Sequence, residues 1–503
     1  MTGQSIVAWF PDFTQIGGPL SQLFSRRVTG SHHTLHYWWQ HQAALPSFVR
    51  ESSVAMRCVQ LLGPLAWEQF PERDLQPHWH QAPVPYAPFA AACLVKLEYH
   101  LPHMSSLRQF LVDHPPLLWV LGFPLVPSHR YPWGFDAEAS LSTQRHLTYL
   151  LRQMPNSALQ FLLDSSVQLL QAELGQRGIQ IGTCVSLDTK HVIAWVKENN
   201  PKAYVQDRFN KDHQPAGDPD CRLGCKRRHN QRGPTPETPP TPTHNPIPAN
   251  TLSVGEFYWG YGSGVVAAKV PHWGEFVLAE LTQPFDQGDV TYFFPLMTTT
   301  EKRLGFRPPY AALDAAFDAF YVYEHFHAVG GFAAVPFVGR GGHKKRQFTP
   351  EGLPLCEADL PMPLKFTFMD KHSTLVGHER GRYVCPLRYP QPTSETCPTQ
   401  HKNWAKGGCT VTMPTSIGAR LRYTLDRQTD EYQEVYKQRT ASERVNSQAV
   451  ELGIERPKIR NGAAIANLNT LVYVLINLRA LQRIQQHPCH NAGDVKPSLD
   501  TEN

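Results

Sequence analysis

The stretch GIQIGTCVSLDTKHVIAWV, residues 178–196, decides the fold class. It is rich in β-branched residues, and apolar side chains alternate with polar ones, which predicts a β-strand. Val185 and Leu187 should point to one face of this strand. Asp188 and Lys190 should point to the other face. A carboxylate is unusual in the middle of a strand, so Asp188 is a candidate functional residue.

Downstream segments extend this strand into a sheet. EFYWGYGSGVVAAKV (256–270) and EFVLAELTQPF (275–285) have the composition of strands, and a helix is expected around 288–302. YAALDAAFDAFYVYEHFHAVGGFAAVPFV (310–338) predicts a strand, a helix and a second strand, as in a βαβ unit. We therefore expect an α/β fold with a mixed sheet flanked by helices.

The remaining chain divides into segments that differ in composition and residue pattern. Residues 142–174 predict two helices that break near Pro155, with Ser142 as N-cap of the first helix. At 503 residues the chain is long enough for several domains. The predicted parts are a helical N-terminal domain at 1–175, the first part of the core at 176–338 with a Pro-rich loop at 206–254, an irregular insertion at 339–425, the last part of the core at 426–486, and a flexible tail at 487–503.

Composition favours a folded, reduced protein with a mildly basic surface. Hydrophobic residues make up 41% of the chain, and the net charge of +5 is compatible with a nucleic-acid partner. The ten cysteines are too dispersed for a disulfide framework. The N-terminus lacks the pattern of a secretory signal, and the apolar stretch 468–481 is too short and too interrupted by polar residues to span a membrane. We therefore expect a cytoplasmic protein with no membrane partner.

A late polar segment, VYKQRTASERVNSQ (435–448), predicts a single helix. Tyr436, Arg439 and Glu443 would share one face of it. The simplest interpretation is a solvated ion pair between the arginine and the glutamate, which contributes only ~0.2–0.5 kcal/mol.

Three acidic residues form the alternative, catalytic interpretation. Asp188 lies on the first strand, Asp314 at the end of a later strand, and Glu443 on the late helix. If the fold brings them together, such carboxylates can hold two Mg²⁺ ions ~3.5–4 Å apart, and Mn²⁺ can substitute. That arrangement suits in-line attack on a phosphodiester.

This order of motifs resembles the DDE transposases of bacterial insertion sequences, which have an RNase H-like catalytic core. The late Tyr-x2-Arg-x3-Glu is similar to the family's Tyr-Arg-Glu-Lys signature, while SLDTKHVIAWVKENNP and DAAFDAFYVYE resemble its two aspartate segments. The resemblance covers roughly 106–486. It departs from the family at Val450, where a basic residue is expected, and Arg444 or Lys458 are candidates to replace that residue.

The resemblance implies a metal-dependent enzyme that cleaves DNA at transposon ends and transfers the strand into target DNA. Asp188, Asp314 and Glu443 would be the catalytic residues and Mg²⁺ ligands. The partners would be double-stranded DNA, namely terminal inverted repeats and target, and a second copy of the chain in a homodimer on the DNA. The protein would associate with the nucleoid, and the N-terminal domain would bind DNA. The residues expected to contact DNA are Tyr436, Arg439, Arg444, Lys190, Lys226, Arg227, Arg228, Lys344, Lys345 and Arg346.

Two other functions stay open from the sequence. One is an RNase H-fold nuclease or resolvase without strand transfer, and the other is a DNA-binding protein whose acidic triad is degenerate. Terminal inverted repeats beside the gene would favour transposition.

The insertion suggests a second metal. Four cysteines in a segment with little apolar content are candidate structural zinc ligands, although their spacing does not match paired C-x2-C knuckles. They are Cys356, Cys385, Cys397 and Cys409. Near the second aspartate, Asp318 is expected to act as a helix N-cap, which leaves Asp314 as the catalytic residue.

Overall fold

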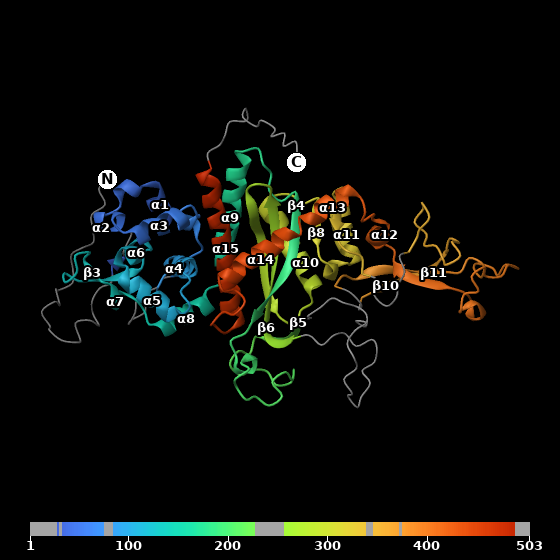
Figure 1. Cartoon of the computed structure of the whole chain (residues 1–503), viewed down its shortest axis with the longest axis horizontal. Helices are drawn as coiled ribbons and strands as arrows, with labels where there is room; N and C mark the ends of the chain where they lie inside the picture. Colours follow the sequence, from blue (N-terminus) through green and yellow to red (C-terminus); the bar gives the residue numbers. More distant parts are fainter. Residues whose placement is uncertain are drawn as a thin grey trace, which may run out of the picture. The chain divides into compact units, whose positions relative to one another are not determined.

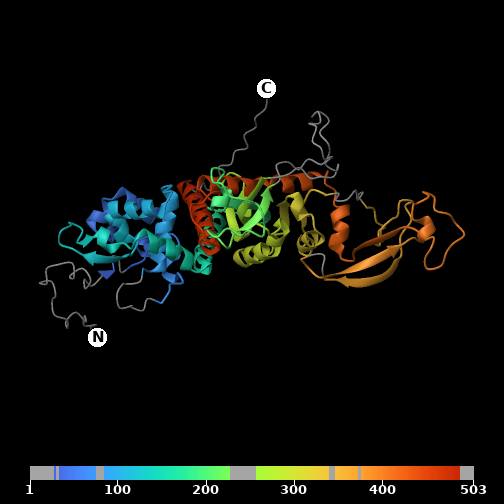
Figure 2. The same ribbon diagram turned by 90° about the horizontal axis from the view of Figure 1, so that it is seen from below.

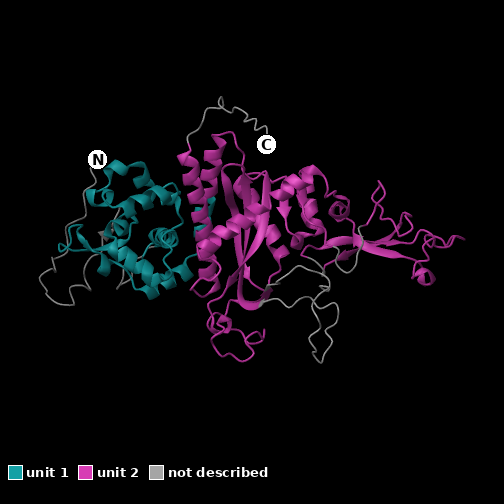
Figure 3. Ribbon diagram, in the orientation of Figure 1, with its two compact units in different colours: residues 1–165 teal, residues 166–503 magenta. Residues whose placement is uncertain are grey.

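The structure is a computed structural model, and it divides into two compact units, residues 1–165 and 166–503 (Figure 3). The boundary falls inside a helix, α9 (Asn156–Gly175), and so lies earlier than the predicted boundary at 175. The residues that the structure describes are 28–29, 33–74, 84–226, 256–338, 346–371 and 375–487.

Unit 1 is mainly helical, as predicted. Its described helices are α1 Leu35–Gln40, α2 Ser47–Arg50, α3 Ser53–Leu62, α4 Tyr86–Glu98, α5 Met104–Asp113, α6 Pro115–Val120, α7 Ala137–Ser140, α8 Gln144–Gln153 and the first part of α9. A small antiparallel sheet has the order β1-β2-β3, formed by β1 Val28–Thr29, β2 Pro124–Pro127 and β3 Phe135–Asp136.

The predicted helix break at Pro155 is confirmed, because α8 ends at Gln153 and α9 begins at Asn156. The predicted cap of α8 is wrong by one residue. The Thr143 hydroxyl, not that of Ser142, accepts a hydrogen bond from the His146 N–H at 3.3 Å. Both residues are good caps, and the sequence alone does not separate them.

Unit 2 contains the mixed sheet predicted from residue 178 onward, with helices on both sides (Figures 1 and 2). Its strand order is β5-β6-β4-β8-β9, with β7 also paired to β6. β4 runs antiparallel to β6 and parallel to β8, and β8 runs parallel to β9. The strands are β4 Cys184–Ile193, β5 Arg222–Lys226, β6 Glu256–Val270, β7 Gly274–Pro284, β8 Tyr310–Leu313 and β9 Phe332–Ala334.

The two faces of β4 pack against different helices. Leu187 lies in the hydrophobic core that also contains residues of α9 (Asn156–Gly175), α10 (Phe293–Leu304) and α11 (Phe320–His327). Ser186 faces the opposite way and bonds to α14 (Thr440–Glu451). The strand alternation therefore directs Asp188, two residues after Ser186, towards the α14 side.

The last helix, α15 (Gly462–Gln486), packs against β7. The register of β7 shifts beside Leu278, where the strand carries an extra residue relative to β6. The buried Asn477 amide of α15 bonds both main-chain groups of Val277, at 2.8 Å each. The Asn477 side chain thereby satisfies the main-chain hydrogen-bonding groups that the bulge leaves unpaired, and this fixes the position of β7.

By length and hydropathy, α15 is the one helix in the described ranges that could cross a membrane. Most of its apolar window, 89%, is buried inside the protein, and it carries buried Asn467, Asn469 and Asn477. It is therefore the core helix predicted from residues 468–481.

The insertion is more regular than predicted. It contains a three-stranded antiparallel sheet, followed by α12 (Ile417–Thr424). The strands are β10 Leu364–Asp370, β11 His378–Val384 and β12 Thr410–Pro414. The prediction of an irregular segment was wrong because it passed over the alternation of Leu364, Phe366 and Phe368 in β10, a strand pattern whose apolar side chains are exposed.

The predicted helix 435–448 is two helices, α13 (Asp430–Lys437) and α14. Between them the chain forms a tight turn, in which the Arg439 N–H bonds to the carbonyl of Tyr436, three residues earlier, at 3.0 Å. The break lets α13 pack against β8 and β9 while α14 packs against β4 and β6. Tertiary packing thus overrides the continuous helical propensity.

Asp318 is not a helix N-cap, because Ala319 occupies that position of α11. Its carboxylate is buried, accepts hydrogen bonds from Arg422 at 2.8 and 2.7 Å, and also accepts one from the Val338 N–H. Asp318 is therefore the centre of a buried ion pair that holds α12 to the core.

Candidate active site

The first two predicted carboxylates lie side by side. β4 and β8 are parallel neighbours, and their last paired residues are Leu187 and Leu313. Asp188 and Asp314 are the next residues along each strand, so they project to the same face from strands ~4.8 Å apart. Asp314 stands where β8 ends, and its carboxylate accepts the Ala316 N–H at 2.8 Å.

The third carboxylate is brought in by α14, which is anchored at two points on β4. The Ser442 N–H donates to the Ser186 hydroxyl at 2.9 Å, and the Asn446 amide donates to an Asp188 oxygen at 3.0 Å. Glu443 lies on the same helix face as Asn446, three residues earlier. The helix α14 therefore presents the Glu443 carboxylate and the Asn446 amide together on the face that lies towards β4.

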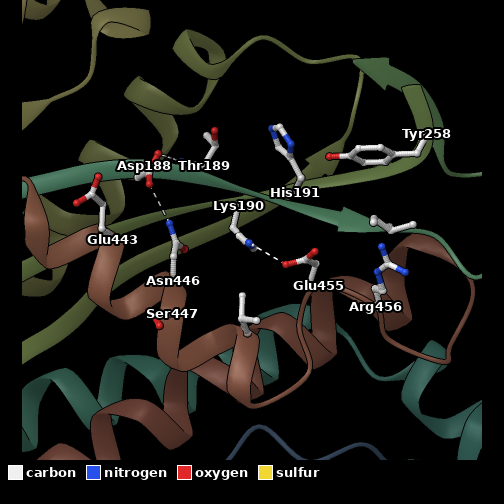
Figure 4. A pocket seen from close by; sticks show the side chains of 12 residues that line it. Asp188, Thr189, Lys190, His191, Tyr258, Glu443, Asn446, Ser447, Glu455 and Arg456 are labelled. Atoms are coloured by element: carbon white, nitrogen blue, oxygen red, sulfur yellow. Dashed lines mark hydrogen bonds and ion pairs between the residues drawn. The ribbon is translucent and has the colours of Figure 1, made fainter. Parts of the chain in front are cut away.

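Asp188, Glu443 and Asn446 line one pocket, with a volume of about 520 Å³, whereas Asp314 is not among its lining residues (Figure 4). Asp188 and Glu443 lie at the same end of it, and the sheet and α14 form its walls. The other lining residues are Thr189, Lys190, His191, Ile193, Tyr258, Ser447, Val450, Glu455 and Arg456.

The aspartates are held in an environment that disfavours their charge. Burial raises the pKa of Asp188 to about 6, and the nearby Asp314 carboxylate adds to that rise. Burial likewise raises the pKa of Asp314, with a further contribution from the Asp289 carboxylate. Buried acidic groups that lie close together are typical of metal-binding and catalytic centres.

The predicted stripe of Tyr436, Arg439 and Glu443 is in contact despite the helix break. The Arg439 guanidinium bonds the Glu443 carboxylate at 2.7 Å and lies 5.9 Å from the centre of the Tyr436 ring. The arginine and glutamate side chains are 31% and 47% exposed, so a phosphate could reach both. As an exposed pair, they contribute at most ~1 kcal/mol to stability.

Other predicted DNA contacts have partners within the protein. Lys190 pairs with Glu455 at 3.0 Å, and Arg444 pairs with Glu275 at 2.7 Å. Arg346 is partly buried. The backbone of Lys226 ends β5, while the remaining predicted contacts, Arg227, Arg228, Lys344 and Lys345, lie outside the described residues.

The four candidate zinc ligands are only partly assembled. Cys356 and Cys385 both act electrostatically on Cys409, whereas Cys397 sits in a turn of its own. All are free thiols.

Sequence reasoning missed three residues of the pocket region. Asn446 had a signal, since it is three residues from Glu443 on one helix. Asp289, which accepts a hydrogen bond from the Thr189 hydroxyl at 2.7 Å, begins a 3₁₀ turn (Asp289–Tyr292) in the segment where a helix was expected, and that pattern did not connect it with Thr189. Arg456 also lines the pocket, at the end away from Asp188 and Glu443 (Figure 4).

The donors around Asp188 suit Mg²⁺ chemically. The aspartates and Glu443 offer only oxygen atoms, and the buried Asn446 Oδ1 has no hydrogen-bond partner in the described structure. Among the described residues, no three His, Cys, Asp or Glu side chains stand close enough to hold one ion. Mg²⁺ does not require three, because it commonly uses one or two carboxylates together with water and substrate phosphate.

Comparison with known proteins does not assign the chain to a family, because no protein-family model and no curated protein matches it.

Proposed function

We propose that this protein is a DDE transposase that cleaves DNA at transposon ends and joins the freed strand to target DNA. The observation that carries the proposal is the placement of Asp188 and Asp314 at neighbouring positions on adjacent parallel strands, together with the pocket that Asp188 shares with Glu443. The sequence order of these residues and the Tyr436–Arg439–Glu443 contact add support. A mixed sheet flanked by helices is compatible with an RNase H-like core.

The chain's own groups have distinct roles in this proposal. Asp188 and Asp314 would hold Mg²⁺ or Mn²⁺, with Glu443 and the Asn446 carbonyl as further oxygen donors. The bound ions would supply Lewis acidity for in-line displacement at a phosphodiester. Arg439 would release Glu443 and bind a DNA phosphate as a charged, planar donor, and Tyr436 would orient the guanidinium.

The proposal extends to partners and location. The chain would act as a homodimer on double-stranded DNA carrying terminal inverted repeats, in the cytoplasm at the nucleoid. A nuclease or resolvase without strand transfer would use the same pocket, and the joining step separates the two functions.

A plasmid that carries the genomic DNA flanking the gene on both sides tests the proposal. With Mg²⁺, the wild-type protein should nick the plasmid at the borders of the element and join the cut ends to a second plasmid. Glu443→Gln should reduce nicking at least ~100-fold, because loss of a transition-state contact of this kind costs several kcal/mol. DNA binding should change little.

Glu451→Gln is the matched control, since Glu451 is an exposed carboxylate at the far end of the same helix. Its nicking rate should equal the wild-type rate. Normal nicking by Glu443→Gln would refute the assigned triad, and nicking without joining would support the nuclease instead.

A further inference from the structure

The insertion carries four cysteines that the proposed cleavage chemistry does not use. We propose that Cys356, Cys385, Cys397 and Cys409 form a structural zinc site that fixes the insertion. The zinc site does not depend on the proposed transposase activity, and its test does not require DNA.

Two of the thiols face each other across a pair of strands. Val384, the last residue of β11, pairs with Thr410, the first residue of β12. Cys385 and Cys409 come next on either strand and therefore lie opposite each other. Gly408 has a positive φ of 89°, and a Cβ there would stand 2.6 Å from the Cys385 Cβ. The glycine thus leaves the space that the Cys385 side chain occupies.

Cys356 joins this pair from a short hairpin. Its N–H bonds to the Leu360 carbonyl at 3.0 Å, and the Val384 N–H bonds to the Pro363 carbonyl at 3.1 Å, which places the hairpin beside the end of β11. Cys356 and Cys409 pack against the same small hydrophobic cluster, which contains Met362, Tyr383, Met413 and Ala419. Three thiols therefore share one partly buried location.

Three of the four cysteines begin the same kind of turn. In each turn the N–H three residues later bonds to the cysteine carbonyl at 3.1 Å: Asp359 to Cys356, Arg388 to Cys385, and Gln400 to Cys397. Such turns can direct main-chain N–H groups towards the sulfur. The Ala358 N–H donates to the Cys356 sulfur at 3.4 Å. Donors of this kind favour the thiolate, which is the form that binds a metal.

The segment between Cys397 and Cys409 contacts the turn of Cys385 through Trp404. The Arg388 guanidinium, at the end of the Cys385 turn, lies 3.9 Å from the centre of the Trp404 ring. Within its own turn, the Cys397 sulfur lies 3.4 Å from the Thr399 hydroxyl oxygen. No three ligand side chains of the described residues are yet at metal-binding distance, so zinc would draw the Cys397 turn in as the fourth ligand.

The chemistry of the donor set selects the metal. Four thiolates in a tetrahedral arrangement suit Zn²⁺, and each thiol releases its proton on binding. The insertion also has a small core, formed by Met362, Tyr383, Met413 and Ala419. A metal site would supply stability that such a core cannot.

The test is the metal content of the full-length protein, purified without chelator and measured by elemental analysis. We expect about one zinc per chain. Cys356→Ser, Cys385→Ser, Cys397→Ser and Cys409→Ser should each lower it to below about a tenth. Cys225→Ser, which removes an exposed thiol outside the insertion, should retain the full content. Replacement of zinc by Co²⁺ should produce thiolate-to-cobalt absorption in the wild-type protein.

Three results would overturn the proposal. They are wild-type protein without zinc and with all four thiols titratable, a disulfide between Cys385 and Cys409 in the intact protein, and retention of zinc by any of the four serine variants. If the serine variants fail to fold, Cys409→His decides, because histidine is also a zinc ligand. Zinc retained in that variant supports the site, and zinc lost from it refutes the site.

Discussion

Replacing Asp188 by asparagine should stabilise the folded protein at pH 8 in the absence of metal. Burial and the Asp314 carboxylate raise the pKa of Asp188 from 3.8 to about 6. A raised folded-state pKa means that the protonated form is favoured, so the ionised carboxylate costs stability above pH 6, and that cost vanishes below about pH 4. At about 1.36 kcal/mol per pH unit, its upper limit is about 3 kcal/mol.

The local hydrogen bonds should survive the substitution. The Asn446 amide now donates to Asp188, while its own Oδ1 accepts nothing in the described structure. If the Asn446 amide turns over by 180°, its Oδ1 accepts from the introduced amide, whose carbonyl keeps the Thr189 N–H that the carboxylate now accepts at 2.8 Å. Allowing for a weaker bond to a neutral acceptor, we expect a net stabilisation of about 1–3 kcal/mol at pH 8.

Urea unfolding in EDTA, followed by tryptophan fluorescence and circular dichroism, measures the difference. At pH 5 the advantage of Asp188→Asn should be about 1.4 kcal/mol smaller than at pH 8. Mg²⁺ should stabilise the wild-type protein at pH 8 and leave the variant unchanged. Glu451→Gln controls for loss of a carboxylate. A variant less stable than wild type at pH 8, or a difference that does not vary with pH, would refute the reasoning.

Three further substitutions separate catalysis from stability. Arg439→Ala should change the free energy of unfolding by less than about 1 kcal/mol, because the pair it breaks is exposed, yet it should lower plasmid cleavage. Cleavage at the wild-type rate at every salt concentration would limit Arg439 to a surface role. Asp318→Asn should cost about 3–5 kcal/mol in urea unfolding, since it leaves the partly buried Arg422 without its charged partner. A loss below about 1 kcal/mol would show that the amide replaces the carboxylate there. Asn477→Leu should cost about 2–4 kcal/mol by leaving both main-chain groups of Val277 unbonded, and wild-type stability would mean that water or the chain replaces these bonds.

The sequence predicted local elements well where one periodicity dominated. The alternation around Asp188 identified β4, and the leucine spacing identified α8 and α9. It failed where distant packing decides the outcome. Asp318 looked like a cap because its partner Arg422 is remote in sequence. Asp289 could not be assigned to the site, because only the fold places the turn Asp289–Tyr292 beside Thr189.

The bond between Asn477 and β7 has a consequence for the order in which the protein is made. β7 leaves the ribosome long before α15, so until residue 477 has been synthesised the bulge at Val277 lacks the amide that bonds both its main-chain groups. α14, which brings Glu443 to the pocket, is also made late. A nascent chain therefore completes its sheet and its pocket only after α14 and residue 477 of α15 have been synthesised. An incomplete chain would hold both aspartates without a finished site.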